Sequence, residues 1–200
     1  MSMSSYEVVR RAIEFERPDR LPMRFEALGV TDTHSVGWNQ IGTGDRNQRQ
    51  TVDEWGCVWA RSDEPNMGQV KGHPLADWAA LADYRWPDPG DPALFDGMDA
   101  RLAAAGDKYV TTGIFMLLFE RMHALHGFEA TLADLYLERE RIEALADRIV
   151  EFDLAMIEAI SQRFPRGIHG FTFTDDWGTQ QALIVRPALW ESFFKPRYKR

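Results

Sequence analysis

The chain has 200 residues, 44% of them apolar, which is enough to bury one substantial core. Its 23 basic and 31 acidic side chains give a formal charge of −8, which repels the phosphate backbone of nucleic acids and anionic membrane surfaces. The sequence contains neither a run of about 18 uncharged apolar residues nor the apolar core of a signal peptide, so we expect a cytoplasmic protein that binds no nucleic acid and no membrane.

The only cysteine, Cys57, cannot form an internal disulfide and has no second thiol with which to build a CxxC metal site. It lies between Trp55-Gly56 and Val58-Trp59, which favours a small buried apolar residue. We expect one domain over residues 1–200.

The first 20 residues predict a helix that precedes the main fold. Ser4 followed by Glu7 has the spacing of a capping box, the apolar residues after it fall on one stripe, and Pro18 should end the helix. We expect this segment to act as a lid helix.

Residues 21–105 predict a first strand followed by a hairpin and connectors. From Leu21 to Leu28 apolar residues alternate with polar ones, which predicts a strand with Arg24 and Glu26 on one face. The stretch from Thr31 to Arg49 has little periodicity and predicts a long loop. The remaining elements of this part are a hairpin with strands at 55–60 and 68–71, and a proline-rich connector at 86–92.

Residues 106–200 predict regular βα units. The expected elements in this part and just before it are a helix over 94–105, a strand over 108–112, a turn from Gly113, a helix over 114–125 that Gly127 ends, a long helix over 142–160, a strand over 168–174 and a helix that Pro187 opens. Two strands joined through helices of this length predict a parallel sheet with a right-handed crossover.

Such units build either an open doubly wound sheet or a closed barrel. The glycine-rich GxGxxG and Walker A motifs are absent, which disfavours the common nucleotide-binding open sheets. A full (β/α)8 barrel takes about 250 residues, and a helical pattern is still running at Arg200. We therefore expect this chain to hold the N-terminal part of a larger barrel and to fold poorly alone.

The sharpest chemical feature is an apolar strand, 168–174, that runs directly into Asp175 and Asp176 and then a glycine turn. In a barrel these carboxylates lie at the C-terminal mouth, where active sites are built. Adjacent residues leaving a strand point in different directions, so we expect one of the two to face a reacting group while the other holds a loop. The alternative is that both are turn or helix-cap residues.

Glu120, His123 and His126 lie on one face of a predicted helix and have the spacing of a metal-ligand set. A helix this apolar more often carries histidines as capping or packing groups, so we expect no metal from this segment. His34 and His73 are isolated, and we interpret them as structural or exposed.

Four stretches in order resemble the uroporphyrinogen decarboxylase-like family, which includes corrinoid-linked methyltransferases. The stretches are Arg11-Ala12-Ile13-Glu14-Phe15-Glu16-Arg17-Pro18-Asp19-Arg20-Leu21-Pro22, Asp53-Glu54-Trp55-Gly56, Gly72-His73-Pro74-Leu75, and the segment from Asp175 through Gly178-Thr179-Gln180 to Pro196. The resemblance implies a (β/α)8 TIM barrel, an enzyme and a small-molecule substrate.

The resemblance leaves the reaction open between two activities. In the decarboxylase an arginine-rich motif, Arg-Gln-Ala-Gly-Arg-Tyr, binds the many carboxylates of its tetrapyrrole substrate. Here Arg24 takes the place of the first arginine, but the second is missing and Glu26 adds a repelling charge. The family's aspartate and tyrosine in the following segments also have no counterpart. We therefore favour the methyltransferase branch over porphyrin-forming decarboxylation, and a barrel that only binds a ligand is a third alternative.

The methyltransferase branch implies zinc and a corrinoid. The zinc ligands of that branch are a His-x-Cys motif and a later Cys, which belong to the second half of the barrel, and the corrinoid comes on a partner protein. A homodimer is a further expectation. The expected site residues are Asp175 and Asp176 for catalysis, and Arg24, Glu26, Gln180 and His123 for substrate binding.

Overall fold

A computed structural model describes residues 2–39, 49–62 and 68–200, and it shows a mixed α/β chain. The chain divides into two compact units, and each is built from three separate segments. Unit 1 comprises residues 1–39, 91–114 and 157–173, and unit 2 comprises residues 40–90, 115–156 and 174–200.

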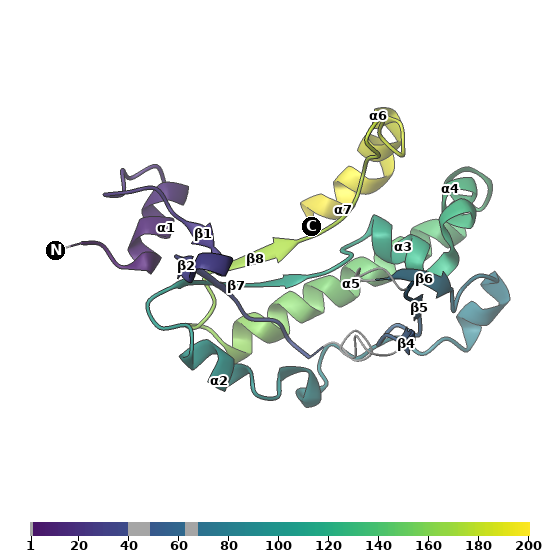
Figure 1. Ribbon diagram of the computed structural model, residues 1–200. Coiled ribbons are helices and arrows are strands. Elements are labelled where there is room, and N and C mark those ends of the chain that lie inside the picture. The colour runs from purple at the N-terminus through teal and green to yellow at the C-terminus, as the bar shows by residue number, and fades with distance from the viewer. Residues whose placement is uncertain (1, 40–48, 63–67) are drawn as a thin grey trace. The chain divides into compact units, whose positions relative to one another are not determined.

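A three-stranded parallel sheet forms the centre of unit 1 (Figure 1). Its strand order is β3 (Thr33–Ser35), β7 (Tyr109–Ile114) and β8 (Gly170–Phe173). Alternate residues of β7 are buried, as expected for a central strand with one covered face. The predicted strands at 108–112 and 168–174, and their parallel pairing, are confirmed. The described residues contain no closed barrel.

Gly113 lies within β7 and does not begin a turn, so that prediction was wrong. It pairs with Thr172 of β8, and a Cβ atom at this position would overlap the Thr172 carbonyl oxygen. The glycine is needed because two backbones approach closely, which a sequence pattern does not distinguish from a turn.

The predicted N-terminal helix is confirmed as α1 (Ser5–Ile13), and the Ser4 hydroxyl accepts a hydrogen bond from the Glu7 amide. The chain leaves the helix before Pro18, with Phe15 in the left-handed region at a φ of 59°. The predicted helix over 94–105 is divided into η3 (Pro92–Phe95) and α2 (Met98–Ala103). Gly97, with a φ of 72°, separates them.

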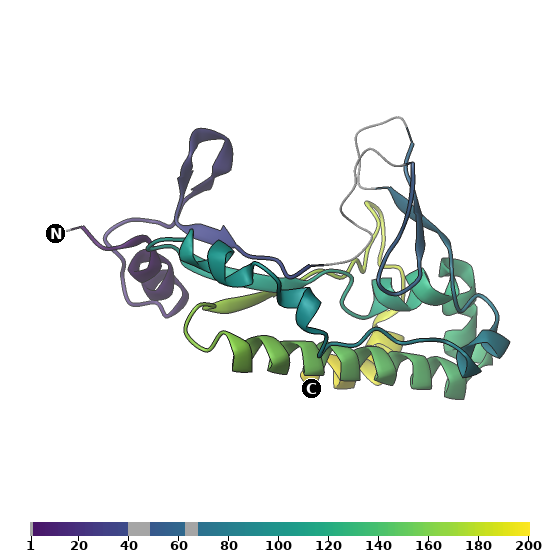
Figure 2. The ribbon, with the colours of Figure 1, turned by 90° about the horizontal axis from the view of Figure 1, so that it is seen from below.

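The predicted strand from Leu21 to Leu28 was wrong. The segment forms a small hairpin with β1 (Arg24–Phe25), η1 (Glu26–Leu28) and β2 (Val30–Thr31). Figure 2 shows it standing away from the sheet of unit 1, and its apolar side chains are largely exposed, Leu28 by 76%. Alternation therefore does not mark a buried strand here.

The first parallel strand is instead β3, within the stretch predicted as a long loop. Its sequence, Thr33-His34-Ser35, is polar and carries no apolar alternation, so it gives no strand signal. Asp32, just before it, accepts a hydrogen bond from the Met23 amide at 2.8 Å and pairs with Arg20 at 2.6 Å. Residues 40–48 of the predicted loop lie outside the described residues.

Unit 2 contains a three-stranded antiparallel sheet. It consists of β4 (Gln50–Val52), β5 (Val58–Ala60) and β6 (Gln69–Gly72). The predicted hairpin is confirmed in β5 and β6, and β4 is an additional strand. Residues 63–67 of its loop lie outside the described residues. After η2 (Trp78–Ala82), residues 84–91 form neither helix nor strand, as expected for a connector.

Three helices link β7 to β8: α3 (Phe119–His126), α4 (Phe128–Leu137) and α5 (Arg139–Arg163). Gly127 ends α3, and α5 is one continuous helix that contributes residues to both units (Figure 2). One stripe of α5 is buried, as its apolar periodicity predicts.

The helix that Pro187 opens is also confirmed. It runs through α6 (Pro187–Leu189), the π-helical turn η4 (Trp190–Phe194) and α7 (Lys195–Lys199). Arg197 of α7 pairs with Asp147 at 2.8 Å. Among the helices of the described ranges, none has the length and apolar content needed to cross a bilayer.

Candidate functional site

The residues that follow β7 and β8 meet directly after the two strands end. The Leu117 amide donates a hydrogen bond to the Thr174 carbonyl oxygen at 2.9 Å, and the Met116 amide donates to the Thr174 hydroxyl at 3.0 Å. The carboxyl ends of adjacent parallel strands are where α/β folds build their sites. These loop residues and the first turns of α3 belong to unit 2 and form the candidate site.

Asp175 caps the N-terminus of α3. Its Oδ2 accepts hydrogen bonds from the Leu118 and Phe119 amides at 3.0 and 2.8 Å, and its Oδ1 accepts one from the Glu120 amide at 2.7 Å. The N-cap residue of the helix itself, Leu118, has no side-chain acceptor, so the cap comes from a different segment. The carboxylate also lies favourably at the positive end of the helix dipole.

Tyr198 of α7 supplies a fourth donor to Asp175, through its hydroxyl to Oδ2. Burial and then the Asp175 charge raise the pKa of Tyr198 above its ordinary value, so the phenol keeps its proton. Trp177 and Trp190 pack around the Tyr198 ring, with centroids 6.0 and 6.3 Å away. Asp175 thus joins the strand-end loop, α3 and α7. A catalytic role for it stays a prediction.

The different environments of Asp175 and Asp176 predict different effects on stability. Asp175→Ala removes the cap of α3 and should lower the free energy of unfolding by about 1–2 kcal/mol. Asp176→Ala is the matched control, because this side chain is exposed and should change stability by less than about 0.5 kcal/mol. Urea unfolding of both variants measures the difference. Equal stabilities would contradict the capping role.

Asp176 is the exposed member of the pair. No hydrogen bond or ion pair reaches its side chain from the parts of the chain that the structure describes. Its charge acts on Glu120 and on His123, both on α3. Asp176 is therefore the strand-end carboxylate that is open to a ligand.

Glu120 is a site residue that the sequence analysis considered only as a metal ligand. It is half-buried in the first turn of α3, where burial and then the charges of Asp175 and Asp176 raise its pKa to about 7. A carboxyl group that titrates near neutrality is suited to exchange protons with a substrate. Only its position after a predicted strand could have indicated this role.

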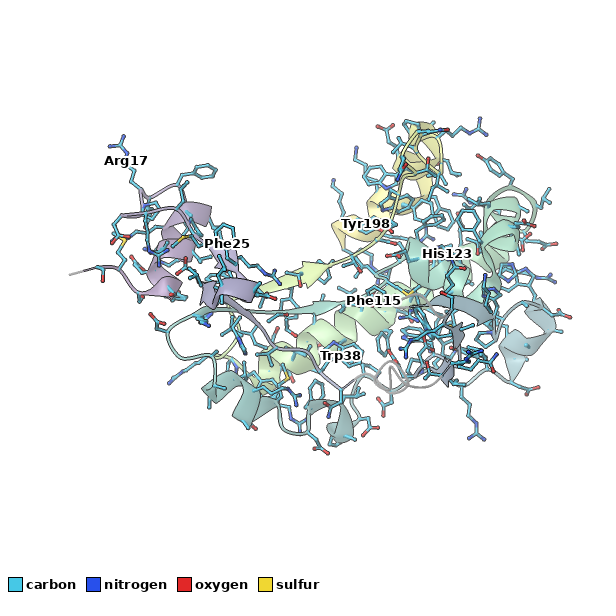
Figure 3. All side chains as sticks on the ribbon, viewed as in Figure 1. Arg17, Phe25, Trp38, Phe115, His123 and Tyr198 are labelled. Carbon is cyan, nitrogen blue, oxygen red and sulfur yellow. The ribbon has the colours of Figure 1, made fainter. Side chains whose placement is uncertain are left out.

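His123 lies one turn after Glu120 on the same face of α3. Its ring contacts the edges of Phe119 and Phe128, with centroid distances of 5.2 and 5.4 Å. Burial, followed by the nearby His73 and Arg121, lowers the pKa of His123 to about 4, so the imidazole is neutral at pH 7. Figure 3 labels His123 on α3 and Tyr198 on α7.

Gln180 lies at the exposed tip of the loop after β8. Gly178 and Leu183 form an isolated bridge across this tip, and the Thr179 hydroxyl accepts hydrogen bonds from the Gln181 and Ala182 amides at 3.2 and 3.1 Å. Gln180 follows Asp176 by four residues, and its side chain is exposed. Its expected contact with substrate stays a prediction.

Arg24 and Glu26 belong to unit 1, in the hairpin that also carries Phe25, labelled in Figure 3. The Arg24 Nε donates to Glu26 Oε1 at 3.0 Å, and the two side chains are 65% and 68% exposed. The structure therefore pairs these two residues with each other, in an exposed ion pair of little energetic value. It brings Asp175, Asp176 and His123 together in unit 2.

His126 packs in the interior, which is the role that the sequence analysis favoured over metal binding. Its Nδ1 is bonded to the Leu75 carbonyl oxygen at 2.6 Å and its Nε2 to Asp134 at 2.9 Å, and the ring stacks on Trp78 at 4.0 Å. Across residues 2–39, 49–62 and 68–200, no group of three or more His, Cys, Asp or Glu side chains is placed to hold a metal ion.

Known proteins give no further guide to this site. No protein-family model matches the chain, and no curated protein or solved structure matches it either. The function is therefore inferred from the geometry of the strand-end loop and of α3.

Proposed function

We propose that the chain is part of a (β/α)8-barrel enzyme of the uroporphyrinogen decarboxylase-like family. The parallel order β3, β7, β8 supports this, because the parallel strands of a barrel follow one another around the sheet in the order in which they occur along the chain. Three strands are fewer than the eight of a barrel, so the proposal requires further strands from outside these residues.

One observation carries the enzymatic proposal: Glu120, with a pKa raised to about 7, lies beside the exposed Asp176 where two parallel strands end. A carboxyl group whose pKa burial and neighbouring charges raise to about 7 is suited to act as a general acid. In the proposed reaction Glu120 donates a proton to the substrate, Asp176 accepts hydrogen bonds from its polar groups, and the neutral His123 supplies a further donor or acceptor.

We propose methyl transfer as the reaction, with a corrinoid protein and a second copy of the chain as partners and a small methylated compound or thiol as substrate. Its support is that Arg24 lacks the second arginine of the decarboxylase motif and has the negative charge of Glu26 beside it, which makes a poor site for a polycarboxylate. Decarboxylation of uroporphyrinogen is the second candidate. It has the support of the proton donor Glu120, because replacing a carboxyl group by hydrogen requires a proton.

The described residues do not fit the zinc that the family resemblance implies. They contain no group of side chains that is placed to hold a metal ion. Their one thiol, that of Cys57, is fully buried and donates a hydrogen bond to the Ala124 carbonyl oxygen. Burial and then Asp53 raise the pKa of Cys57 to about 12, which disfavours the thiolate that binds metal. The proposal therefore assigns zinc to other residues and routes no step through it.

Two assays on the purified protein separate the candidate reactions. We expect consumption of methylcobalamin in the presence of a thiol, followed by its visible absorption, and no conversion of uroporphyrinogen to coproporphyrinogen, followed by chromatography of the oxidised porphyrins. Protein carrying Asp176→Asn is the control for adventitious reaction. Conversion of uroporphyrinogen without corrinoid turnover would replace methyl transfer by decarboxylation, and inactivity in both assays would leave neither reaction supported.

A further inference from the structure

A buried ion pair lies between the hairpin sheet of unit 2 and α3. Asp53 Oδ2 accepts a hydrogen bond from Arg121 at 3.2 Å, and the two side chains are only 1% and 5% exposed. Asp53 also accepts hydrogen bonds from the Trp55 and Cys57 amides and from the Trp59 indole, at 3.0, 2.8 and 2.9 Å. This carboxylate is fully satisfied and balances the Arg121 charge.

Two further carboxyl groups lie in the field of the same guanidinium, and neither forms an ion pair with it. Glu54 is hydrogen-bonded to its own backbone amide and to Trp55, but its buried Oε2 atom makes no hydrogen bond. Asp153, only 6% exposed, falls on the buried apolar stripe of α5, and none of the described residues forms a hydrogen bond or ion pair with it. Three carboxyl groups therefore share one cation in the interior, where an unpaired charge is costly.

The surrounding charges do not compensate both groups. Arg121 attracts the ionised forms of Glu54 and Asp153, but Asp53 repels the first and Asp175 repels the second. Tyr84 and Cys57 also lie nearby, and burial raises the pKa of each, so both stay neutral. Burial is the main cause that raises the pKa of Glu54 to about 7 and that of Asp153 to about 8.

We propose that Glu54 and Asp153 form a proton-linked switch that holds the β4–β5 turn against α3 and α5 while both carboxyl groups carry their protons. The contacts at stake are those of Trp55, which packs against Phe152 of α5 at 4.6 Å and lies under the Arg121 guanidinium at 4.8 Å. Loss of the protons introduces buried anions beside these contacts and loosens them. The charge of Arg121 also acts on Glu120, so a displacement of Arg121 would alter the charges around the candidate site.

The expected sign follows from the raised pKa values. In the folded chain each carboxyl group keeps a proton that the same group loses near pH 4 in the unfolded chain. Its contribution to stability is therefore fully present below about pH 4. This contribution is lost as pH rises to about 7 for Glu54 and to about 8 for Asp153. His123, whose pKa is lowered, acts in the opposite direction only below about pH 6.5. The unfolding equilibrium constant should therefore rise between pH 6.5 and 8, by up to about tenfold per pH unit for each carboxyl group that is still protonated.

The test compares the wild type with Glu54→Gln/Asp153→Asn by urea unfolding across pH 6.5 to 8.5. The double variant cannot ionise at these positions, so the pH dependence should shrink to the share of Glu120, whose pKa is also raised to about 7. The matched control is Glu129→Gln/Asp99→Asn, which alters two exposed carboxylates and should keep the wild-type slope. A double variant with the wild-type slope would overturn the proposal.

A second measurement does not depend on the variants being stable. Carbon NMR of the carboxyl groups in the folded wild type should show that Glu54 and Asp153 titrate between pH 6.5 and 8.5. Hydrogen exchange at the Trp55 and Cys57 amides should become faster over the same pH range. Carboxyl groups that are already ionised at pH 6, or exchange that does not follow their titration, would overturn the switch.

Discussion

Turnover should fall about 10²- to 10⁴-fold when Asp176 is replaced by asparagine, because Asp176 binds the polar groups of the substrate and its charge helps to raise the pKa of the proton donor Glu120. The substitution keeps the shape of the side chain but removes the charge that lies beside Glu120. Because Asp176 is exposed, the free energy of unfolding should change by less than about 0.5 kcal/mol. Activity and stability are therefore expected to separate in this variant.

Glu120→Gln and the pH profile complete the measurement. Glu120 is proposed as a proton donor, so kcat/KM should fall as pH rises through about 7, and this limb should disappear in Glu120→Gln. Asp99→Asn, an exposed change on α2 in unit 1, is the control for loss of a negative charge. Full activity in Asp176→Asn would show that the exposed carboxylate has no role in the reaction.

The largest effect on stability is expected at Asp53. Asp53→Ala leaves the buried Arg121 guanidinium without its ionic partner and should lower the free energy of unfolding by about 3–5 kcal/mol. It also leaves the Trp55 and Cys57 amides and the Trp59 indole without their acceptor. The midpoint of urea unfolding measures the loss.

Asp99→Ala also serves as the control for this experiment, because it removes an exposed carboxylate and should change stability by less than about 0.5 kcal/mol. Asp53→Asn should lie between Asp53→Ala and the wild type, since its amide oxygen keeps part of the hydrogen bonding. If Asp53→Ala lowers the free energy of unfolding by less than about 1 kcal/mol, Arg121 has found another partner. The ion pair would then not be a main source of stability.

The regular second half of the chain could be predicted from its sequence, because periodicity there reports burial directly. The stripe of α5 and the strand β7 bury the side chains that the pattern marks, whereas Phe173 of β8 stays 46% exposed. In the hairpin 24–31 the same kind of alternation occurs without burial, and the polar strand β3 has no alternation at all. These elements depend on backbone pairing, which a single-strand pattern does not record.

The candidate site could be predicted only in position. An apolar strand running into two acidic residues indicates a strand end, but the division of roles between Asp175 and Asp176 depends on partners elsewhere in the chain. The amides that Asp175 caps lie 55 to 57 residues away from it. Glu120 becomes a candidate acid through burial and neighbouring charges, and neither property is encoded locally.

The interleaving of the two units has a consequence for the order of folding during synthesis. Unit 1 needs strand β8, so it cannot complete its sheet until the ribosome has passed Phe173, although α1 is made well before that point. Unit 2 needs α7 to bind Asp175 and must wait longer still. Contacts between such distant segments slow folding and expose apolar surface meanwhile. The nascent chain should therefore keep this apolar surface exposed until nearly all of these residues have emerged.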